Sequence, residues 1–185
     1  DLPILVEVIL GISLYPGHGR ESGVLLRAAA VAARAARNLA LGCAVYSAER
    51  DVSDPRSLEL LADLRQGIEE NQLFLQFQPS LDLRGGRVVG VEALVRWRHP
   101  RFGLVPPNQF IPLAERTALV QPLTRWILNE ALRCAQSWQR RGISLFVSVN
   151  LSARNLHDPD LVERIQGLRE TWGVSWSAIE FEITE

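Results

Sequence analysis

The sequence predicts an α/β fold, a partial (β/α) barrel, over roughly the last two thirds of the chain. Short apolar runs rich in β-branched residues, such as Val88–Val95, alternate with period 2 as strands do. Between them lie segments such as Leu123–Arg140, whose apolar residues recur at helical spacing. Alternation of strands with amphipathic helices is typical of a parallel sheet built from strand–helix units.

The first 47 residues predict a strand, a helix and a second strand. Ile4–Tyr15 is an extended apolar run, which predicts a buried strand, and the alanine-rich Ser22–Leu41 predicts a helix. Cys43–Tyr46 then predicts a short returning strand. Because three elements of this size cannot bury a core alone, we expect residues 1–47 to be the end of a larger domain. A polar linker over residues 48–57 follows.

We expect the main domain over residues 58–185. Its first helix is expected to begin in the preceding linker, at the Asp54-Pro55 pair. The turn Arg84–Arg87 is typical of a hairpin, so we expect the strands on either side of it to pair antiparallel. A loop rich in glycine and proline follows His99-Pro100. The later predicted elements, in chain order, are a short helix at Asn108–Thr117, a helix at Leu123–Arg140, a strand at Leu145–Ser152, a helix at Asp160–Trp172 and a strand at Ala178–Glu185.

The composition favours a globular protein over a nucleic-acid-binding, disulfide-rich or membrane-spanning one. The chain is 47% hydrophobic and 22% charged with a net charge of −1, which is typical of a globular domain and argues against non-specific binding of a nucleic acid polymer. The two cysteines, Cys43 and Cys134, are too few for a disulfide framework or a zinc site, so we expect a cytoplasmic location. No apolar run is long enough to cross a bilayer, so no membrane contact is expected within these residues. The three histidines lie in predicted turns and are expected to be solvated: His18, His99 and His157.

Polar residues gather at the carboxyl ends of the predicted strands. Glu92, Asn150, Glu182 and Glu185 all lie toward such ends, which meet at one mouth in a (β/α) barrel. Oxygen donors without a nearby histidine or cysteine pair favour Mg²⁺ or Mn²⁺ over zinc. A bound divalent ion of this kind can polarise a phosphoryl oxygen and generate hydroxide near neutral pH. The residues therefore predict a hard-metal site suited to phosphodiester cleavage.

Plainer interpretations of the same residues exist. Glu92 could be a structural carboxylate paired with Arg96 or Arg98. Strand alternation does not choose between Glu180 and Glu182, because both have the same parity.

Several motifs, in order, resemble the signature of EAL domains, bacterial phosphodiesterases that linearise cyclic di-GMP. The match covers roughly Leu58–Glu185, about the first half of such a domain. It implies a TIM-like (β/α) barrel with an antiparallel first strand. The matching motifs are Phe77-Gln78-Pro79, Glu92-Ala93-Leu94-Val95-Arg96-Trp97, Phe110-Ile111-Pro112-Leu113-Ala114-Glu115, Val149-Asn150-Leu151-Ser152 and Glu182-Ile183-Thr184-Glu185.

The resemblance implies roles for individual residues. Ligands of Mg²⁺ or Mn²⁺ would be Glu92, Asn150 and Glu182. Glu185 joins Glu92 in the catalytic set and would steady a loop near the metals. The substrate-binding residues would be Gln78, Leu94 and Arg96. The family's paired aspartates, lysine and further glutamates would follow Glu185, so we expect this chain alone not to hydrolyse cyclic di-GMP. Ser80 and Asn155 depart from the usual family residues.

The first 47 residues resemble the C-terminal end of a GGDEF (diguanylate cyclase) domain. Gly11–Pro16 is similar to a strand end of that family, and Leu25–Ala29 is similar to the start of its last helix. The family's aspartate in this helix falls on Ala30 and its lysine on Arg37, so we expect a degenerate or regulatory domain.

The combined expectation is a piece of a longer GGDEF–EAL signalling protein, since the chain starts at Asp1 and ends in a strand-like segment. That protein would hydrolyse cyclic di-GMP to linear pGpG, act as a homodimer through the EAL domain, and be cytoplasmic or anchored to the inner membrane by another segment. Two alternatives stay open: a non-catalytic receptor for cyclic di-GMP, and a scaffold that only dimerises or contacts partners.

Overall fold

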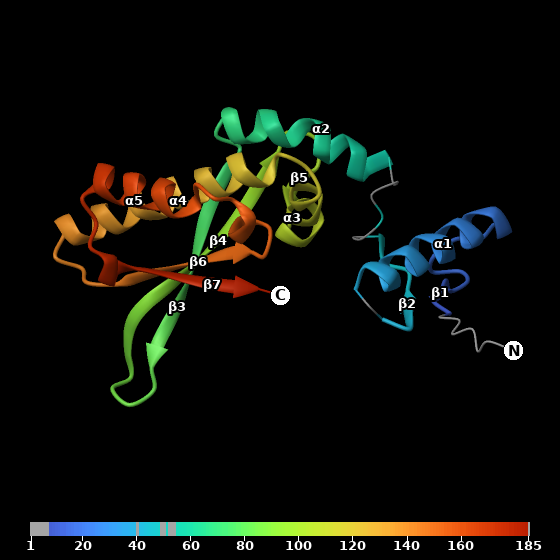
Figure 1. The fold of residues 1–185 in the computed structure, drawn as a ribbon, viewed down its shortest axis with the longest axis horizontal. Helices are drawn as coiled ribbons and strands as arrows, with labels where there is room; N and C mark the ends of the chain where they lie inside the picture. The colour runs from blue at the N-terminus through green and yellow to red at the C-terminus, as the bar shows by residue number, and fades with distance from the viewer. Residues whose placement is uncertain (1–7, 40, 49–50, 52–54, 185) are drawn as a thin grey trace, which may run out of the picture. The chain divides into compact units, whose positions relative to one another are not determined.

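The computed structural model describes residues 8–39, 41–48, 51 and 55–184 (Figure 1). The chain divides into two compact units, residues 1–58 and 59–185.

The first unit is one helix packed on two short parallel strands. Strand β1 (Leu10–Ile12) pairs with β2 (Cys43–Val45), and α1 (Ser22–Asn38) lies against both. Gly11 permits this close approach, because a side chain there would collide with the backbone of Ala29 in the helix.

The prediction of a long buried first strand is wrong for the residues that the structure describes. Only Leu10–Ile12 is strand, and the side chain of Leu10 is 58% exposed. A single helix covers one face of a two-stranded sheet, so the other face stays open to solvent. Residues 4–7 of the predicted strand lie outside the described part.

The second unit alternates strands and helices as the sequence predicts. Its elements in chain order are α2 (Pro55–Glu69), β3 (Leu73–Asp82), β4 (Arg87–His99), β5 (Gly103–Val105), α3 (Pro107–Glu115), α4 (Val120–Arg140), β6 (Phe146–Ser152), α5 (Leu161–Trp172) and β7 (Ile179–Thr184). Short 3₁₀ turns precede α5 and β7. The predicted helices and strands of this unit are present, with ends that differ by a few residues.

One five-stranded sheet organises the second unit. The strand order is β3-β4-β6-β7, and β5 pairs with the end of β4. Strands β3 and β4 are antiparallel, as the predicted hairpin turn requires, whereas β4, β6 and β7 run parallel. Strand β5 was not predicted. It forms because Gly103, at φ +68°, turns the chain back so that Trp97 pairs with Val105.

Helices α4 and α5 cover one face of the sheet (Figure 1). Alternate residues of the parallel strands point into this core, including Val91, Ala93, Val147 and Val149. The helices contribute Leu128, Leu132 and Ile165, among others. Residues of the opposite parity therefore lie on the other face of the sheet, and this is where the polar strand residues are found.

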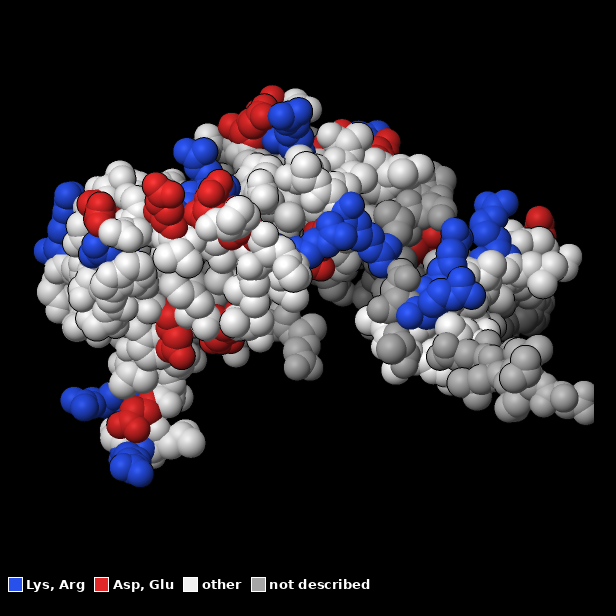
Figure 2. All heavy atoms as spheres, viewed as in Figure 1, with Lys and Arg blue, Asp and Glu red and all other residues white. Residues whose placement is uncertain are grey.

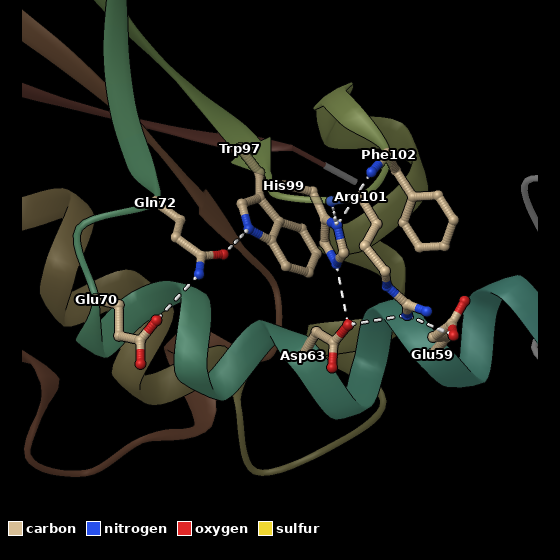
Figure 3. Close-up of polar contacts among 8 residues, drawn as sticks. All are labelled: Glu59, Asp63, Glu70, Gln72, Trp97, His99, Arg101 and Phe102. Atoms are coloured by element: carbon tan, nitrogen blue, oxygen red, sulfur yellow. Dashed lines mark hydrogen bonds and ion pairs between the residues drawn. The ribbon is translucent and has the colours of Figure 1, made fainter.

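Helix α2 is fastened to the end of β4 by polar contacts (Figure 3). His99 Nδ1 accepts hydrogen bonds from the backbone N–H groups of Arg101 and Phe102, at 3.1 and 3.3 Å. The ring proton therefore lies on Nε2, which donates to Asp63 of α2 at 3.1 Å. The Arg101 guanidinium also pairs with Glu59 and Asp63.

The expectation that the three histidines are solvated is wrong for His99. It is only 2% exposed and stacks edge-on against Trp97, with ring centroids 4.9 Å apart. Trp97 is fully buried and donates from Nε1 to the Gln72 side chain at 3.1 Å. The chain after β4 folds back under α2, so a residue in a predicted turn becomes part of the core.

Acidic and basic side chains are interspersed over the second unit on the face that Figure 2 shows. Ion pairs of this unit include Arg164–Asp158, at 3.2 Å, and Arg133–Glu130. In the described part of the chain, no helix has the length and apolar character that crossing a membrane requires.

Candidate functional site

The polar residues of the candidate site lie on the sheet face opposite α4 and α5. Along β4, Val91, Ala93 and Val95 are buried in the core, whereas Glu92 and Arg96 alternate onto the other face. Parallel pairing sets Glu92 beside Ser148 on β6, and Asn150 beside Glu182 on β7. Registered partners in a sheet share a face, so one surface carries all of these polar side chains.

The structure brings the three predicted metal-binding residues together. Asn150 Nδ2 donates to Glu92 Oε1 at 2.7 Å, which ties β6 to β4. On the other side of β6, Ser148 Oγ donates to Glu182 Oε1. Ser148 is almost completely buried, so its hydroxyl is a fixed donor for that carboxylate. Glu92, Asn150 and Glu182 are therefore neighbours on adjacent strands; whether they bind a metal stays a prediction.

The hydrogen bonds also distinguish Glu182 from Glu180. Both glutamates lie on the same face of β7, since Glu180 is the register partner of Ser148 and Glu182 that of Asn150. Only Glu182 makes a side-chain contact with β6 among the contacts of the described residues. Glu182, rather than Glu180, is therefore hydrogen-bonded to β6, the strand that is also bonded to Glu92 through Asn150.

The plainer interpretation of Glu92 is not what the structure shows. Arg96 donates from Nε to Gln76 at 2.8 Å, and the Arg98 guanidinium lies 5.1 Å from the ring centre of Phe74. Glu92 instead accepts from Asn150. Its partner is thus an amide on the next strand rather than a cation on its own strand.

These residues fit a hard divalent cation by their donor chemistry. The contact to Asn150 uses the amide nitrogen, so its oxygen Oδ1 is left for another partner, as is the second oxygen of each carboxylate. Such oxygens are the ligands that Mg²⁺ and Mn²⁺ take. Among the described residues no group of three or more histidine, cysteine, aspartate or glutamate side chains is placed to hold a metal. The amide of Asn150 is therefore needed as a third donor beside the two glutamates.

The predicted substrate-binding residues flank this group. Gln78 on β3 is the register partner of Glu92, so both lie on the same face. Leu94 and Arg96 follow Glu92 at two-residue intervals and line a cavity of about 260 Å³. Glu185, the last predicted site residue, lies outside the described residues.

The cavity lies where the carboxyl ends of β4 and β6 diverge. The two strands pair only from Gly90 to Ala93, and beyond this point α3 and α4 close the gap. Its walls are mostly apolar, with Ile111 and Ile127 among them, and its polar rim includes Arg96, Glu115 and Asn150. An apolar slot with a few convergent polar groups is the usual form of a small-molecule site.

Three residues of the site were not assigned a role from the sequence. Ser148 and Gln76 share the parity of Glu92 across their strands, and that shared parity is the signal that could have found them. Asn155, which the sequence marks only as a departure from the family pattern, is 4% exposed. Its Oδ1 accepts from the Ser152 N–H at 2.9 Å, and its Nδ2 donates to Thr124 of α4 at 2.8 Å. Asn155 thereby fixes the turn directly after the strand that carries Asn150.

Comparison with known proteins identifies the family. The sequence profile of the EAL domain matches residues 61–185. The chain belongs to the EAL domain family. The cyclic di-GMP phosphodiesterase PA2567 of Pseudomonas aeruginosa is 42% identical to it over 86% of this chain and 27% of its own length. The cyclic di-GMP phosphodiesterase PdeR of Escherichia coli is 36% identical over 98% of this chain and 28% of its own length.

Solved EAL structures also resemble this chain. The structure titled PaMucR phosphodiesterase, c-di-GMP complex, superposes with a TM-score of 0.66 at 40% identity, covering 69% of this EAL chain and 52% of that chain. The EAL enzyme Bd1971 in its cGMP-bound form superposes with a TM-score of 0.64 at 29% identity, covering 87% and 45%. The EAL chain thus spans about a quarter of the length of the two curated relatives and about half of these two solved chains.

Proposed function

We propose that this EAL chain is part of a metal-dependent phosphodiesterase that hydrolyses cyclic di-GMP to linear pGpG in bacterial signalling. The observation that carries the proposal is the group formed by Glu92, Asn150 and Glu182 on one sheet face, beside a cavity lined by Arg96. The names of the relatives support the substrate, since PA2567 and PdeR are both called cyclic di-GMP phosphodiesterases.

The oxygens of Glu92, Asn150 and Glu182 would hold Mg²⁺ or Mn²⁺. The bound ion would supply Lewis-acid activation of a phosphoryl oxygen and of water. The Asn150 and Ser148 hydrogen bonds hold the two carboxylates in place before any ion binds. Ligands that are already oriented lose less conformational freedom on binding, which favours a defined site over a diffuse acidic surface.

The remaining predicted residues would bind the dinucleotide. Arg96 would donate to a phosphate through its planar fork of N–H groups, and Gln78 and Leu94 would contact the guanine part. Glu185 would act with Glu92 in the catalytic set by steadying a loop near the metals. In the hydrolysis, the oxygen of water would bond to phosphorus as the bond from phosphorus to one ribose oxygen breaks, and a proton of that water would pass to the ribose oxygen.

The proposal extends to the architecture around the site. Strands β3, β4, β6 and β7 would be the first part of a TIM-like barrel in which β3 is the antiparallel first strand. Residues 1–47 would be the C-terminal end of a degenerate GGDEF domain, and residues 48–57 a linker to the EAL portion at 58–185. The longer protein would be a homodimer through its EAL domain and cytoplasmic or anchored at the inner membrane.

Binding of Mn²⁺ and of cyclic di-GMP to the purified 185-residue chain tests the proposal. Free Mn²⁺ is measured by electron paramagnetic resonance and the dinucleotide by calorimetry. We expect E92Q and E182Q each to weaken Mn²⁺ binding by about tenfold or more, because a charged ligand becomes neutral. E180Q is the matched control on the same face of β7, and it should change Mn²⁺ affinity by no more than about twofold.

The outcomes separate the functions that the sequence leaves open. A scaffold would bind neither ion nor dinucleotide, and a receptor would bind the dinucleotide with no loss of Mn²⁺ affinity in E92Q. Equal Mn²⁺ affinities of E180Q and E182Q would also contradict the proposed ligand set. We expect no steady formation of pGpG by this chain alone. Steady turnover that E92Q abolishes would show instead that the chain carries a complete catalytic set.

A further inference from the structure

Gln76 on β3 holds the side chain of Arg96 in one orientation. Its Oε1 accepts a hydrogen bond from Arg96 Nε at 2.8 Å, across two antiparallel strands. Arg96 Nη1 donates to the backbone carbonyl of Val95 at 2.9 Å. Gln76 is the register partner of Leu94, so it reaches Arg96 as a diagonal neighbour on the same face.

These two contacts fix the plane of the guanidinium group. A guanidinium is rigid and flat and has five N–H donors, so two contacts to different nitrogens determine how it lies. The contact to Gln76 occupies the Nε side of the group, and the contact to Val95 occupies one hydrogen of Nη1. The donors left over are the second hydrogen of Nη1 and both hydrogens of Nη2. One hydrogen of Nη1 and one of Nη2 make up the end-on edge of the group, the fork that can bind two oxygens of one phosphate.

Arg96 lies where a guanidinium held in this orientation can bind an anion. Arg96 lines the cavity between the ends of β4 and β6, together with Asn150. Asn150 is hydrogen-bonded to Glu92 at 2.7 Å, so the cavity adjoins the proposed metal ligands. In the part of the chain that the structure describes, Arg96 makes no ion pair with a carboxylate that would compete with an anion.

We propose that Gln76 is a positioning residue that presents the end-on edge of Arg96 to a phosphate of the bound cyclic dinucleotide, an inference that rests on the proposed function. Without Gln76, the long Arg96 side chain would have to be ordered when the ligand binds. Ordering one such side chain weakens binding by about three- to tenfold. Gln76 would raise the affinity for the ligand through its effect on Arg96, without itself contacting the ligand.

Calorimetric titration of the 185-residue chain with cyclic di-GMP in the presence of Mn²⁺ tests this role. Q76M keeps the length of the side chain and removes the acceptor oxygen, so we expect binding to weaken by about three- to tenfold. In the R96A background the same Q76M change should have an effect of less than about twofold, because the residue that it positions is absent. Urea unfolding of each variant checks that stability is unchanged.

A second measurement follows the contact itself. The Nε–H signal of Arg96 in a ¹⁵N correlation spectrum, assigned by its loss in R96A, should shift in Q76M without any ligand. In Q76E, which keeps an acceptor at this position, the signal should stay protected from exchange with water. These two results establish the contact in solution, and the affinities of Q76M with and without Arg96 then separate a positioning role from a purely structural one.

The results overturn the inference in distinguishable ways. Wild-type affinity in Q76M, or an equal loss in Q76M whether or not Arg96 is present, would exclude a positioning role. An unshifted Arg96 Nε–H signal in Q76M would also exclude it. Failure of the wild-type chain to bind cyclic di-GMP at all would refute the proposed function, and this role with it.

Discussion

Replacement of Gly67 by alanine should destabilise the second unit, although the same change in a helix normally stabilises. Gly67 lies in α2 where this helix crosses Trp97. An added Cβ would come within 2.7 Å of Trp97 Nε1 and 3.0 Å of Cε2. The indole cannot move away freely, because Nε1 donates to Gln72 and the ring packs edge-on against His99 (Figure 3). Phe110 also packs edge-on against it.

The sign follows from comparing two magnitudes. Glycine to alanine in a helix contributes about 1 kcal/mol of stability through helix propensity and the unfolded chain. Overpacking a buried contact costs about 1–3 kcal/mol, and loss of the Trp97–Gln72 hydrogen bond adds about 1 kcal/mol. The unfavourable terms are larger, so we expect G67A to lower the free energy of unfolding by about 1–3 kcal/mol.

G167A in α5 is the matched control. An added Cβ at Gly167 meets no atom within 4 Å, so only the favourable helix term applies. We expect G167A to raise the free energy of unfolding by about 0.5–1 kcal/mol. The two variants, each a glycine to alanine change in a helix, should therefore differ by about 1.5–4 kcal/mol with opposite signs.

Urea unfolding followed by tryptophan fluorescence reports on the second unit of the chain, in which both substitutions lie. All five tryptophans lie within residues 59–185: Trp97, Trp126, Trp138, Trp172 and Trp176. With m-values of about 1–3 kcal/mol/M, the urea midpoints of the two variants should be about 0.5 M or more apart. If G67A stabilises the protein as G167A does, the packing of Trp97 against α2 is not what the structure indicates.

Two other predictions concern buried polar groups. N155A should lower the free energy of unfolding by about 2–3 kcal/mol, because Ser152 and Thr124 lose a shared buried partner. The urea midpoint measures this, and a change below about 0.5 kcal/mol would contradict it. Burial, followed by the nearby Glu130 charge, raises the pKa of the Cys134 thiol, so less of the reactive thiolate exists at a given pH. Iodoacetamide should therefore label Cys134 several-fold more slowly than the exposed Cys43 near about pH 8, with the Cys134 rate still rising at higher pH; equal rates would refute this.

Much of the second unit could be predicted because its signals are local. The alternation of Val91, Ala93 and Val95 with Glu92 gives both the strand and the face on which the glutamate lies. The turn at Arg84–Arg87 gives the hairpin that joins β3 and β4. Strand β5 was missed because three residues are too few for a period, and its pairing depends on the positive φ of Gly103.

Contacts between distant residues were not predictable in this way. Ser148 and Glu182 are 34 residues apart, and His99 and Asp63 are 36 apart. No periodicity within either segment indicates that these side chains meet, because their meeting depends on strand register and on how α2 packs. The same limit explains why His99 was expected to be solvated although the fold buries it.

The sequence by itself determined the order of the longer strands and helices of the second unit, the polar residues at the strand ends and the family resemblance, since all of these are patterns along the chain. Only the tertiary structure decided that Asn150 bonds to Glu92, that Glu182 rather than Glu180 bonds to Ser148, and that Gln76 orients Arg96. The physical reason is that a side chain's partners are set by the register between strands, which a whole sheet packed against its helices fixes.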